Sequence, residues 1–533
     1  MPTLQFKGKN IIWNHHLSVP YHTLEEVSKL HFQPDKSNGN LIIEGDNLLA
    51  LKALLPMYAG KVKCICIDPP YNTGNEGWVY NDNANSPLIK DWLGKEVGKD
   101  DLTRHDKWLC MMTPRLRLLR ELLSDDGAIF INIDDLEFHR LRLLCDEVLG
   151  EDNFIADFIW KSRQNVDSRS LNGVSNDHEY ILCYSKNINY KIRGKEIDIS
   201  KYKNPDNDPR GPWMSSSLDG LATAEMRPNL HYTIVNPETG KKYNPAPENG
   251  WRFQRSTAEK IIKEGRMLWP KNDKSKPRFK RYLNERQSEF TGFSSILKTV
   301  FTEQGTRELR DIMDEETIKF PKPVDLIKSL LIQATDKNSV IIDSFSGSGT
   351  TGHAVMDLNK EDGGNRKFIL VQMTEATEKE LDKNICKDIT RERIKRAIEK
   401  YGYNSGFQYL RVGQPLDAET LLKGKLPEYK TFAKYVYYLC TGENLKDEKK
   451  ISEKKFFIGT FGKQAIYLIY KENYEALTRM AINLEFAEKI IADQPDKKRI
   501  VYAPACFLDE EYMEANQIEF VSIPYNLFQR KSG

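Results

Sequence analysis

A short apolar run followed at once by two prolines constrains this chain more than any other feature. Residues 62–67 read Val-Lys-Cys-Ile-Cys-Ile and lie between a glycine at position 60 and the prolines at 69 and 70. So short an apolar stretch with turn residues on both sides is typical of a buried parallel strand. The strand would deliver the quartet Asp68-Pro69-Pro70-Tyr71 to its carboxyl end, which is where ligands bind in open α/β sheets.

The quartet suits a reaction at a flat, weakly nucleophilic amine. The amino group of adenine or cytosine has its lone pair delocalised into the ring. The carboxylate of Asp68 and the carbonyl of Pro69 can each accept one N–H bond from such an amine, which favours a pyramidal nitrogen with its lone pair free. Tyr71 can stack on an extruded base. A strand that merely ends in a Pro-Pro turn, with Asp68 as a local cap, is the plain structural alternative.

A glycine loop lies some 275 residues later (347 minus 72). A strand is predicted over 339–343, and Phe345-Ser346-Gly347-Ser348-Gly349-Thr350 follows it. Glycines let a backbone turn tightly into a helix and approach a ligand closely. With Gly352 the loop also fits the dinucleotide pattern Gly-x-Gly-x-x-Gly, so a nicotinamide-dependent oxidoreductase is an alternative. That pattern calls for an acidic residue at the end of the second strand, but strand 367–371 ends in Gln372, with Glu375 three residues further.

Together the two motifs resemble those of amino-methylating DNA methyltransferases. Residues 68–75 resemble the catalytic motif, and residues 343–352 resemble the S-adenosylmethionine loop. Their order is that of the β-class, in particular the modification subunits of type III restriction–modification systems, over roughly residues 10–400. The resemblance implies base flipping and direct methyl transfer from S-adenosylmethionine to the N6 amine of adenine in double-stranded DNA. Asp68, Pro69, Pro70 and Tyr71 would be catalytic. Cytosine-N4 transfer is the alternative, although the family's cytosine-N4 enzymes often carry Ser where this chain has Asp68.

The resemblance also implies which residues hold the cofactor. Phe345 would pack across the methionine moiety, Lys322 and Pro323 would wall its end, and the ribose contact falls to Gln372 or Glu375. Asp46 would lie near the adenine, with the plain N-cap of the next helix as an equal alternative. The expected cofactor-binding residues are Asp46, Lys322, Pro323, Asp343, Phe345, Gly347, Gly349, Thr350, Gln372 and Glu375.

Between the two motifs the chain turns basic. Residues 251–287 hold twelve basic and four acidic residues, with five aromatic residues interleaved. Phosphate contact plus stacking would need such a mixture, and a basic, solvated surface is the alternative. In the resembling family this insertion is the target-recognition domain. The expected DNA-binding residues are Arg210, Trp213, Arg252, Arg255, Lys276, Arg278, Lys280 and Arg281.

Alternating apolar runs and amphipathic segments predict an α/β fold with a doubly wound sheet. The resemblance makes it a circularly permuted, Rossmann-like S-adenosylmethionine-dependent methyltransferase. A helix is expected over 108–123, ended by Asp125-Asp126-Gly127, with the next strand over 128–133. The expected domains are an N-terminal segment (1–40), a catalytic half (41–184), a target-recognition domain (185–304), a cofactor-binding half (305–402) and a C-terminal accessory α/β domain (403–533).

Composition adds little about partners, because the net charge is only +2. The eight cysteines contain no Cys-x-x-Cys pair, which indicates free thiols in a reducing compartment and no metal site. With no apolar run of about 18 residues and no secretory segment, a cytoplasmic protein is expected. The resemblance implies a homodimer on double-stranded DNA and a restriction subunit as partner. A non-catalytic DNA-binding subunit is the remaining alternative.

Overall fold

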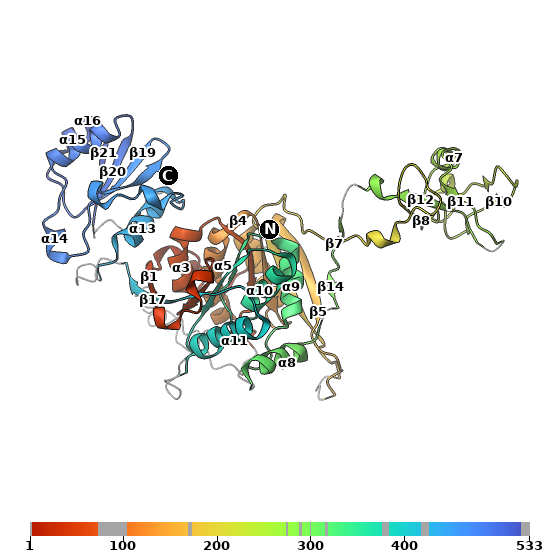
Figure 1. The fold of residues 1–533 in the computed structure, drawn as a ribbon, viewed down its shortest axis with the longest axis horizontal. Coiled ribbons are helices and arrows are strands. Elements are labelled where there is room, and N and C mark those ends of the chain that lie inside the picture. Colours follow the sequence, from red (N-terminus) through yellow and green to blue (C-terminus); the bar gives the residue numbers. More distant parts are fainter. Residues whose placement is uncertain are drawn as a thin grey trace. The chain divides into compact units, whose positions relative to one another are not determined.

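The computed structural model describes residues 3–72, 104–168, 173–272, 275–286, 290–298, 300–314, 318–375, 383–416, 420 and 426–523. The chain forms two compact units. One comprises Met1–Ile192 together with Ser294–Gly533, and the other is the inserted segment Arg193–Phe293. Both are drawn in Figure 1.

A ten-stranded sheet forms the centre of the larger unit. Its middle six strands, from β17 to β4, are all parallel. β6 is antiparallel to both of its neighbours, β1 is antiparallel to β17, and β14 is parallel to β5. In spatial order the strands are β1 (His22–Glu26), β17 (Gln408–Pro415), β2 (Leu41–Glu44), β16 (Lys367–Gln372), β15 (Val340–Asp343), β3 (Val62–Ile67), β4 (Leu123–Ile133), β6 (His178–Ser185), β5 (Phe154–Lys161) and β14 (Ile296–Leu297).

Helices cover both faces of this sheet, so the expected doubly wound α/β fold is confirmed (Figure 1). Ile369 and Val371 of β16 pack in one core with Leu51 of α3. On the opposite face, α10 lies so close to β16 that a Cβ on Gly352 would meet Leu370 at 2.9 Å. The helices of this unit up to α11 are α1 (Lys9–Ile12), α2 (His15–Ser18), α3 (Asn47–Tyr58), α5 (Arg104–Leu122), α6 (Phe138–Cys145), α8 (Thr302–Met313), α9 (Val324–Ala334), α10 (Thr350–Asp362) and α11 (Glu392–Tyr401).

The central pairing joins the two motifs found in the sequence. β3 and β15 are neighbours, with Ile65 opposite Ile342. Both strands are almost wholly buried, as a parallel strand between two helical layers must be. The catalytic quartet follows β3 and the glycine loop follows β15, and parallel strands end at the same edge of a sheet. The fold therefore brings the two motifs together.

One expected boundary is wrong. Asp125-Asp126-Gly127 does not separate a helix from a strand, because α5 ends at Leu122 and β4 begins at once at Leu123. Val62 pairs with Leu123 and Cys64 with Ala128, so the polar residues between them form a bulge within β4. Lys63 of β3 binds the Asp126 carboxylate at 2.6 Å across this bulge. The turn-forming residues thus bend a strand that starts earlier than expected.

The inserted unit has its own small core around the buried Trp251 and Phe279. Its compact part, Arg193–Phe293, is shorter than the expected 185–304 at both ends, because Ser185 ends β6 and Ile296–Leu297 forms β14. Its elements are β7 (Lys195–Glu196), β8 (Trp213–Ser217), β9 (Ile234–Val235), β10 (Lys242–Tyr243), α7 (Arg255–Lys263), β11 (Met267–Leu268), β12 (Arg278–Tyr282) and β13 (Phe290–Thr291).

The C-terminal part has a separate four-stranded sheet in the order β18-β19-β20-β21. The segment is not detached, because its α13 packs on α3 and the ring of Tyr435 lies 4.5 Å from that of Tyr21. β17, which begins at Gln408, belongs to the central sheet rather than to this segment. The elements of the C-terminal part are α13 (Tyr429–Thr441), β18 (Phe457–Phe461), β19 (Gln464–Leu468), α14 (Tyr474–Thr478), α15 (Leu484–Asp493), β20 (Lys498–Ala503), α16 (Glu510–Ala515) and β21 (Ile518–Ser522).

Within the ranges described above, no helix is both long and apolar enough to cross a membrane.

Candidate active site

A cavity of about 500 Å³, counting space open to solvent, lies where β3 and β15 end. The glycine loop, the end of β3 and residues 318–322 form its walls. Six of the predicted site residues line it, namely Asp68, Lys322, Asp343, Phe345, Gly347 and Thr350. The structure thus brings Asp68 and five of the ten predicted cofactor residues to one cavity, whereas Pro69, Pro70 and Tyr71 do not line it.

The two oxygens of Asp68 differ in their surroundings. Oδ2 lies 2.8 Å from Nζ of Lys322, and the two side chains form an ion pair. Oδ1 is buried, and no hydrogen-bond partner for it exists among the described residues. A buried acceptor without a donor is costly. The free Oδ1 is therefore available to an N–H group of a ligand.

Lys322 is shared between two carboxylates. Its Nζ also lies 3.4 Å from Oε2 of Glu179 and 5.0 Å from the centre of the Tyr71 ring. Burial alone would lower the pKa of Lys322, but the carboxylates of Asp68 and Glu179 outweigh it and hold that pKa above its usual value. Lys322 therefore stays charged and fixes the carboxylate of Asp68.

Tyr71 is held by the same network. Its hydroxyl donates a 2.8 Å hydrogen bond to Oε2 of Glu179. Burial, together with the charges of Asp68 and Glu179, raises the pKa of Tyr71 well above its usual value. The quartet is anchored further by Trp108, whose indole N–H donates to the carbonyl of Pro70 at 2.6 Å. Tyr71 thus presents a neutral ring of fixed orientation beside Asp68.

The glycine loop has free space beside Gly347 but not beside Gly349. Gly347 and Gly349 have φ of 49° and 83°, the left-handed region that favours glycine. A Cβ on Gly349 would meet Thr390 at 3.3 Å, whereas a Cβ on Gly347 would meet only the carbonyl of Phe345 at 4.0 Å. The open side at Gly347 lets a ligand approach the backbone, as the methionine part of a nucleoside cofactor requires.

The carboxylate of Asp343, at the end of β15, holds the start of the glycine loop in place. Oδ1 accepts the backbone N–H of Phe345 at 3.1 Å, and Oδ2 accepts the hydroxyl of Thr351 at 2.6 Å. Burial raises the pKa of Asp343 to about 7, against the opposing effect of these two donors. Asp343 therefore acts chiefly as a brace that ties the end of β15 to the start of α10.

The predicted ribose contacts lie outside the cavity. Gln372 accepts the N–H of Gly347 at 2.8 Å and donates to Oε1 of Glu375 at 3.0 Å. Burial raises the pKa of Glu375. The side-chain amide of Gln372 therefore links the glycine loop to the carboxylate of Glu375. A role of either side chain in ribose binding stays a prediction.

Three other predicted cofactor residues also do not line the cavity. Asp46 is the N-cap of α3, accepting the N–H of Leu48 at 2.7 Å, and it receives Arg115 at 3.2 Å. Pro323 caps α9, and Gly349 lies against Thr390. Asp46 thus has the expected N-cap role together with an ion pair to Arg115, and its contact with the adenine stays a prediction.

The eight predicted DNA-binding residues divide into two groups. Five of them bind carboxylates of the inserted unit itself. Lys280 and Arg210 bind Asp208, Lys276 binds Asp219, Arg255 binds Glu259, and the Trp213 indole donates to Asp206. Lys280 is only 7% exposed. The three that remain exposed without a carboxylate among the described residues are Arg252, Arg278 and Arg281.

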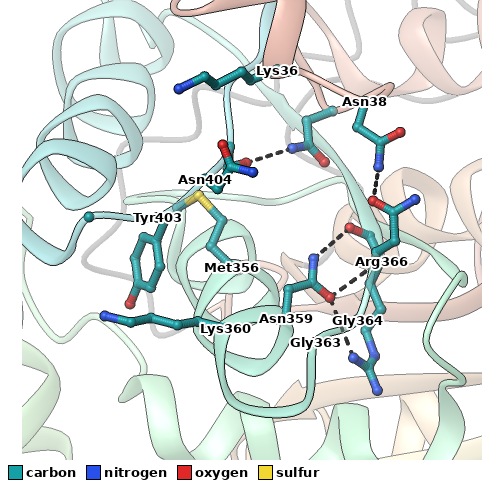
Figure 2. A pocket seen from close by; sticks show the side chains of 14 residues that line it. Lys36, Asn38, Met356, Asn359, Lys360, Gly363, Gly364, Arg366, Tyr403 and Asn404 are labelled. Atoms are coloured by element: carbon teal, nitrogen blue, oxygen red, sulfur yellow. Dashed lines mark hydrogen bonds between the residues drawn. The ribbon is translucent and has the colours of Figure 1, made fainter.

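A second cavity, of about 850 Å³ counted the same way, contains none of the predicted residues. Figure 2 shows that its polar side chains bind one another. Asn38 donates to Asn365, and Asn359 both accepts the N–H of Arg366 and donates to its carbonyl. These polar groups already have hydrogen-bond partners, unlike Oδ1 of Asp68. The second cavity is therefore the weaker candidate for a ligand site.

Comparison with known proteins shows the family of the chain. Residues 62–399, well over half of the chain, match the family described as DNA methylase (N6_N4_Mtase). The chain belongs to this DNA methylase family. The resemblance drawn from the two motifs is therefore confirmed.

Relatives of this chain include Mod subunits of type III restriction-modification enzymes. The Mod subunit of the type III restriction-modification enzyme StyLTI from Salmonella typhimurium is 33% identical over 410 residues, 72% of this chain and 61% of that subunit. The EcoP15I Mod subunit from Escherichia coli is 31% identical over 441 residues, covering 72% and 67%. The type II methyltransferase M.KpnI from Klebsiella pneumoniae is 31% identical over 364 residues, covering 66% and 84%. The chain spans about three fifths of the StyLTI subunit's length.

Two residues beside this cavity are not among the site residues expected from the sequence. Glu179 binds Lys322 and Tyr71. Arg393 is wholly buried, and its side chain lies against the glycine loop. A signal existed for Arg393, since it precedes the buried Ala397 by four residues and so shares its helix face.

Proposed function

We propose that the chain transfers the methyl group of S-adenosylmethionine to the N6 amine of adenine in double-stranded DNA. The observation that carries the proposal is the buried Oδ1 of Asp68, which has no donor among the described residues, at a cavity that the glycine loop also lines. Extruding a base from the duplex exposes its amine to such a site. The family covers N6 and N4 transfer, the Mod names of two relatives favour adenine, and cytosine-N4 transfer is the alternative outcome of the test.

The chain's own groups would prepare the amine. Oδ1 of Asp68 and the carbonyl of Pro69 accept its two N–H bonds, while Lys322 holds the other oxygen of Asp68. Tyr71 stacks on the base. The cofactor supplies an electrophilic methyl group. The nitrogen lone pair would form the new N–C bond, the electrons of the broken S–C bond would stay on sulfur, and the amine would release one proton to water. Positioning and preorganised charge do most of this work.

The same proposal assigns the inserted unit to target recognition. Arg252, Arg278 and Arg281 are the exposed cations most suited to phosphate contact. A homodimer and a restriction subunit with helicase and nuclease activity complete the proposal, and the names of the relatives, Mod subunits of restriction-modification enzymes, support a restriction partner. DNA as substrate and eight free cysteines suit a cytoplasmic location.

The test is single-molecule sequencing with base-modification detection on DNA from a methylation-free host that expresses the chain. N6-methyladenine at one asymmetric motif is the expected result. N4-methylcytosine would replace adenine by cytosine in the proposal. No modified base, from a protein that binds S-adenosylmethionine and DNA in vitro, would identify a non-catalytic DNA-binding subunit.

An Asp68→Ala variant examines the site itself. The substitution removes the acceptor for the amine but no phosphate contact, so transfer is abolished while DNA affinity stays within a few-fold. Radiolabelled methyl transfer and a DNA-binding titration give the two readings. Unchanged turnover would remove Asp68 from the mechanism.

A further inference from the structure

Phe320, which lines the cavity together with Asp68, has a backbone conformation that phenylalanine rarely adopts. Its φ is 55°, in the left-handed region that favours glycine. It also precedes Pro321, and the ring of a proline normally holds the residue before it in an extended conformation. A strained residue of this kind persists only where its surroundings fix it, and such residues cluster at functional sites. Phe320 is therefore a candidate for a role that the quartet and the glycine loop do not fill.

The segment that follows Phe320 is fixed from two sides. On one side it touches α8 backbone to backbone, since a Cβ on Gly305 would collide with the carbonyl oxygen of Pro321. On the other side Lys322 binds the carboxylate of Asp68 at 2.8 Å. Only two positions separate Phe320 from Lys322. The fold therefore sets the position of Phe320 relative to Asp68, as a residue that acts beside the reaction site requires.

Phe320 is nevertheless exposed to solvent. Its exposed fraction is 72%, and its neighbour Lys319 is exposed as well. Single exposed apolar residues are common on protein surfaces, so the exposure alone indicates nothing. Here, however, a strained and fixed backbone keeps an aromatic ring in water beside Asp68. The ring is thus placed for a partner that covers it.

The partner that the cavity implies is a DNA duplex with one base extruded. Extrusion unstacks that base and leaves a gap in the duplex, and proteins offset the cost of unstacking by inserting an apolar side chain between base steps. An aromatic ring suits any sequence, because every base has a face on which a ring can stack. Lys319, next to the ring, can contact a phosphate. An exposed ring on a fixed segment, beside the cavity for the extruded base, meets these requirements.

We propose that Phe320 enters the duplex and fills the space that the extruded base leaves. The proposal rests on the proposed function, because it takes an extruded base as the substrate. The ring does not touch the reacting atoms. It shifts the equilibrium from the paired to the extruded base, and Asp68 and Tyr71 act on the base once it is in the cavity.

The test compares single-turnover methyl transfer to two duplexes that carry the site found by sequencing. The target adenine is paired with thymine in one duplex and mismatched with cytosine in the other, where extrusion costs less. A third duplex carries 2-aminopurine opposite thymine at the target position, and its fluorescence reports extrusion without turnover. Calorimetry with S-adenosylhomocysteine measures the cofactor site separately. The proteins are wild type, Phe320→Ala, Phe320→Leu and the control Phe507→Ala, which removes a 79% exposed phenylalanine from the C-terminal part.

Phe320→Ala should slow transfer to the paired duplex at least about tenfold and to the mismatched duplex less than about threefold, because only the paired base needs the ring to stay extruded. It should also remove most of the 2-aminopurine signal at saturating protein, while the affinity for S-adenosylhomocysteine stays within about twofold. Phe320→Leu keeps an apolar side chain and should retain most of the rate and of the signal. Phe507→Ala should match wild type in every reading.

Three results would overturn this role of Phe320. Equal slowing on both duplexes would assign the ring to the extruded base inside the cavity. Weaker binding of S-adenosylhomocysteine would assign it to the cofactor, and an unchanged rate on the paired duplex would leave it without a role on DNA. If wild type itself transferred no methyl group to either duplex, the proposed function would fail, whereas wild-type transfer with any of these three results would count against Phe320 alone.

Discussion

At the scale of single residues, the site depends on contacts between distant parts of the sequence. Lys322 was expected to wall the methionine end of the cofactor, and it does line that cavity. Its ion pair with Asp68, 254 positions away, could not be predicted, because no local pattern specifies it. Asp68 and Tyr71 were recognisable from their motif alone. Their partner Glu179 was not, because only the fold brings β6 beside the quartet.

Lys322→Met tests whether Lys322 serves the carboxylate or the cofactor. Removing the cation leaves Asp68 and Glu179 facing each other without a counter-charge, which should disorder the acceptor for the amine. Turnover should fall by about two orders of magnitude, while the affinity for S-adenosylhomocysteine changes by less than about threefold. Lys322→Arg should recover part of the turnover. A large loss of cofactor affinity with unchanged turnover would assign Lys322 to the cofactor instead.

Asp343 predicts a pH dependence of stability. Its pKa is about 7 in the folded protein and about 3.9 in an unfolded chain. Between these values the folded state holds a proton that the unfolded state has lost, so the contribution of Asp343 to stability falls as pH rises from about 4 to 7. Asn does not titrate. The stability of Asp343→Asn relative to wild type should therefore rise by up to about 4 kcal/mol over this range.

The measurement is urea unfolding of both proteins at pH 4 and pH 8. Any constant effect of the substitution cancels when the two pH values are compared. Parallel stability curves would show that the two hydrogen bonds from Thr351 and Phe345 keep Asp343 ionised.

At the scale of elements, strands and helices of the catalytic unit followed from apolar periodicity. Buried parallel strands are short continuous apolar runs, and β3, β15 and β16 fit that description. The bulge in β4 did not follow, because Asp-Asp-Gly also favours turns and only pairing with β3 decides between them. The inserted unit was predicted only by charge, since its strands are mostly two to five residues long.

β12 carries neighbouring cations that differ in exposure. Arg278 and Arg281 are exposed, whereas Lys280 is buried on Asp206 and Asp208. Arg278→Ala and Arg281→Ala should each weaken DNA binding and reduce the slope of log K against log salt by about one. Lys280→Ala should instead lower the melting temperature, because it strands two carboxylates. Lys454→Ala, at an exposed lysine of the C-terminal part, is the control for both.

These effects are read from binding isotherms at several salt concentrations and from thermal unfolding. A reduced slope for Lys280→Ala at wild-type stability would reverse the assignment of the two groups.

At the scale of the whole molecule, the C-terminal part shares a core with the catalytic part. Tyr435 and Tyr438 of α13 lie in one cluster with Tyr21 and the leucines of α3, and the Tyr438 hydroxyl donates to Glu121 at 3.1 Å. The sequence predicted a separate unit at this point, because its own sheet is complete. The docking could not be predicted, since tyrosines on α13 serve equally well inside a local core.

Tyr435→Ala should destabilise the larger unit as a whole. The side chain is 2% exposed and packs on Tyr21, so its removal leaves a cavity that typically costs about 3–5 kcal/mol. We expect the melting temperatures of methyltransferase activity and of the C-terminal sheet to fall together. Tyr474→Ala, at a 40% exposed position, should change neither by a measurable amount. Loss confined to the C-terminal sheet would mean that the two cores unfold independently.

The pairing of β3 with β15 also has a consequence for synthesis on the ribosome. β3 ends at Ile67 and its neighbour begins at Val340, roughly 270 residues later. At about 5–20 residues per second, the ribosome needs on the order of tens of seconds to make that stretch. During this time the apolar edge of β3 waits for its partner while the inserted unit can already fold. This exposure favours chaperone binding to the newly made chain, and the cavity can form only after the glycine loop, residues 343–352, has been made.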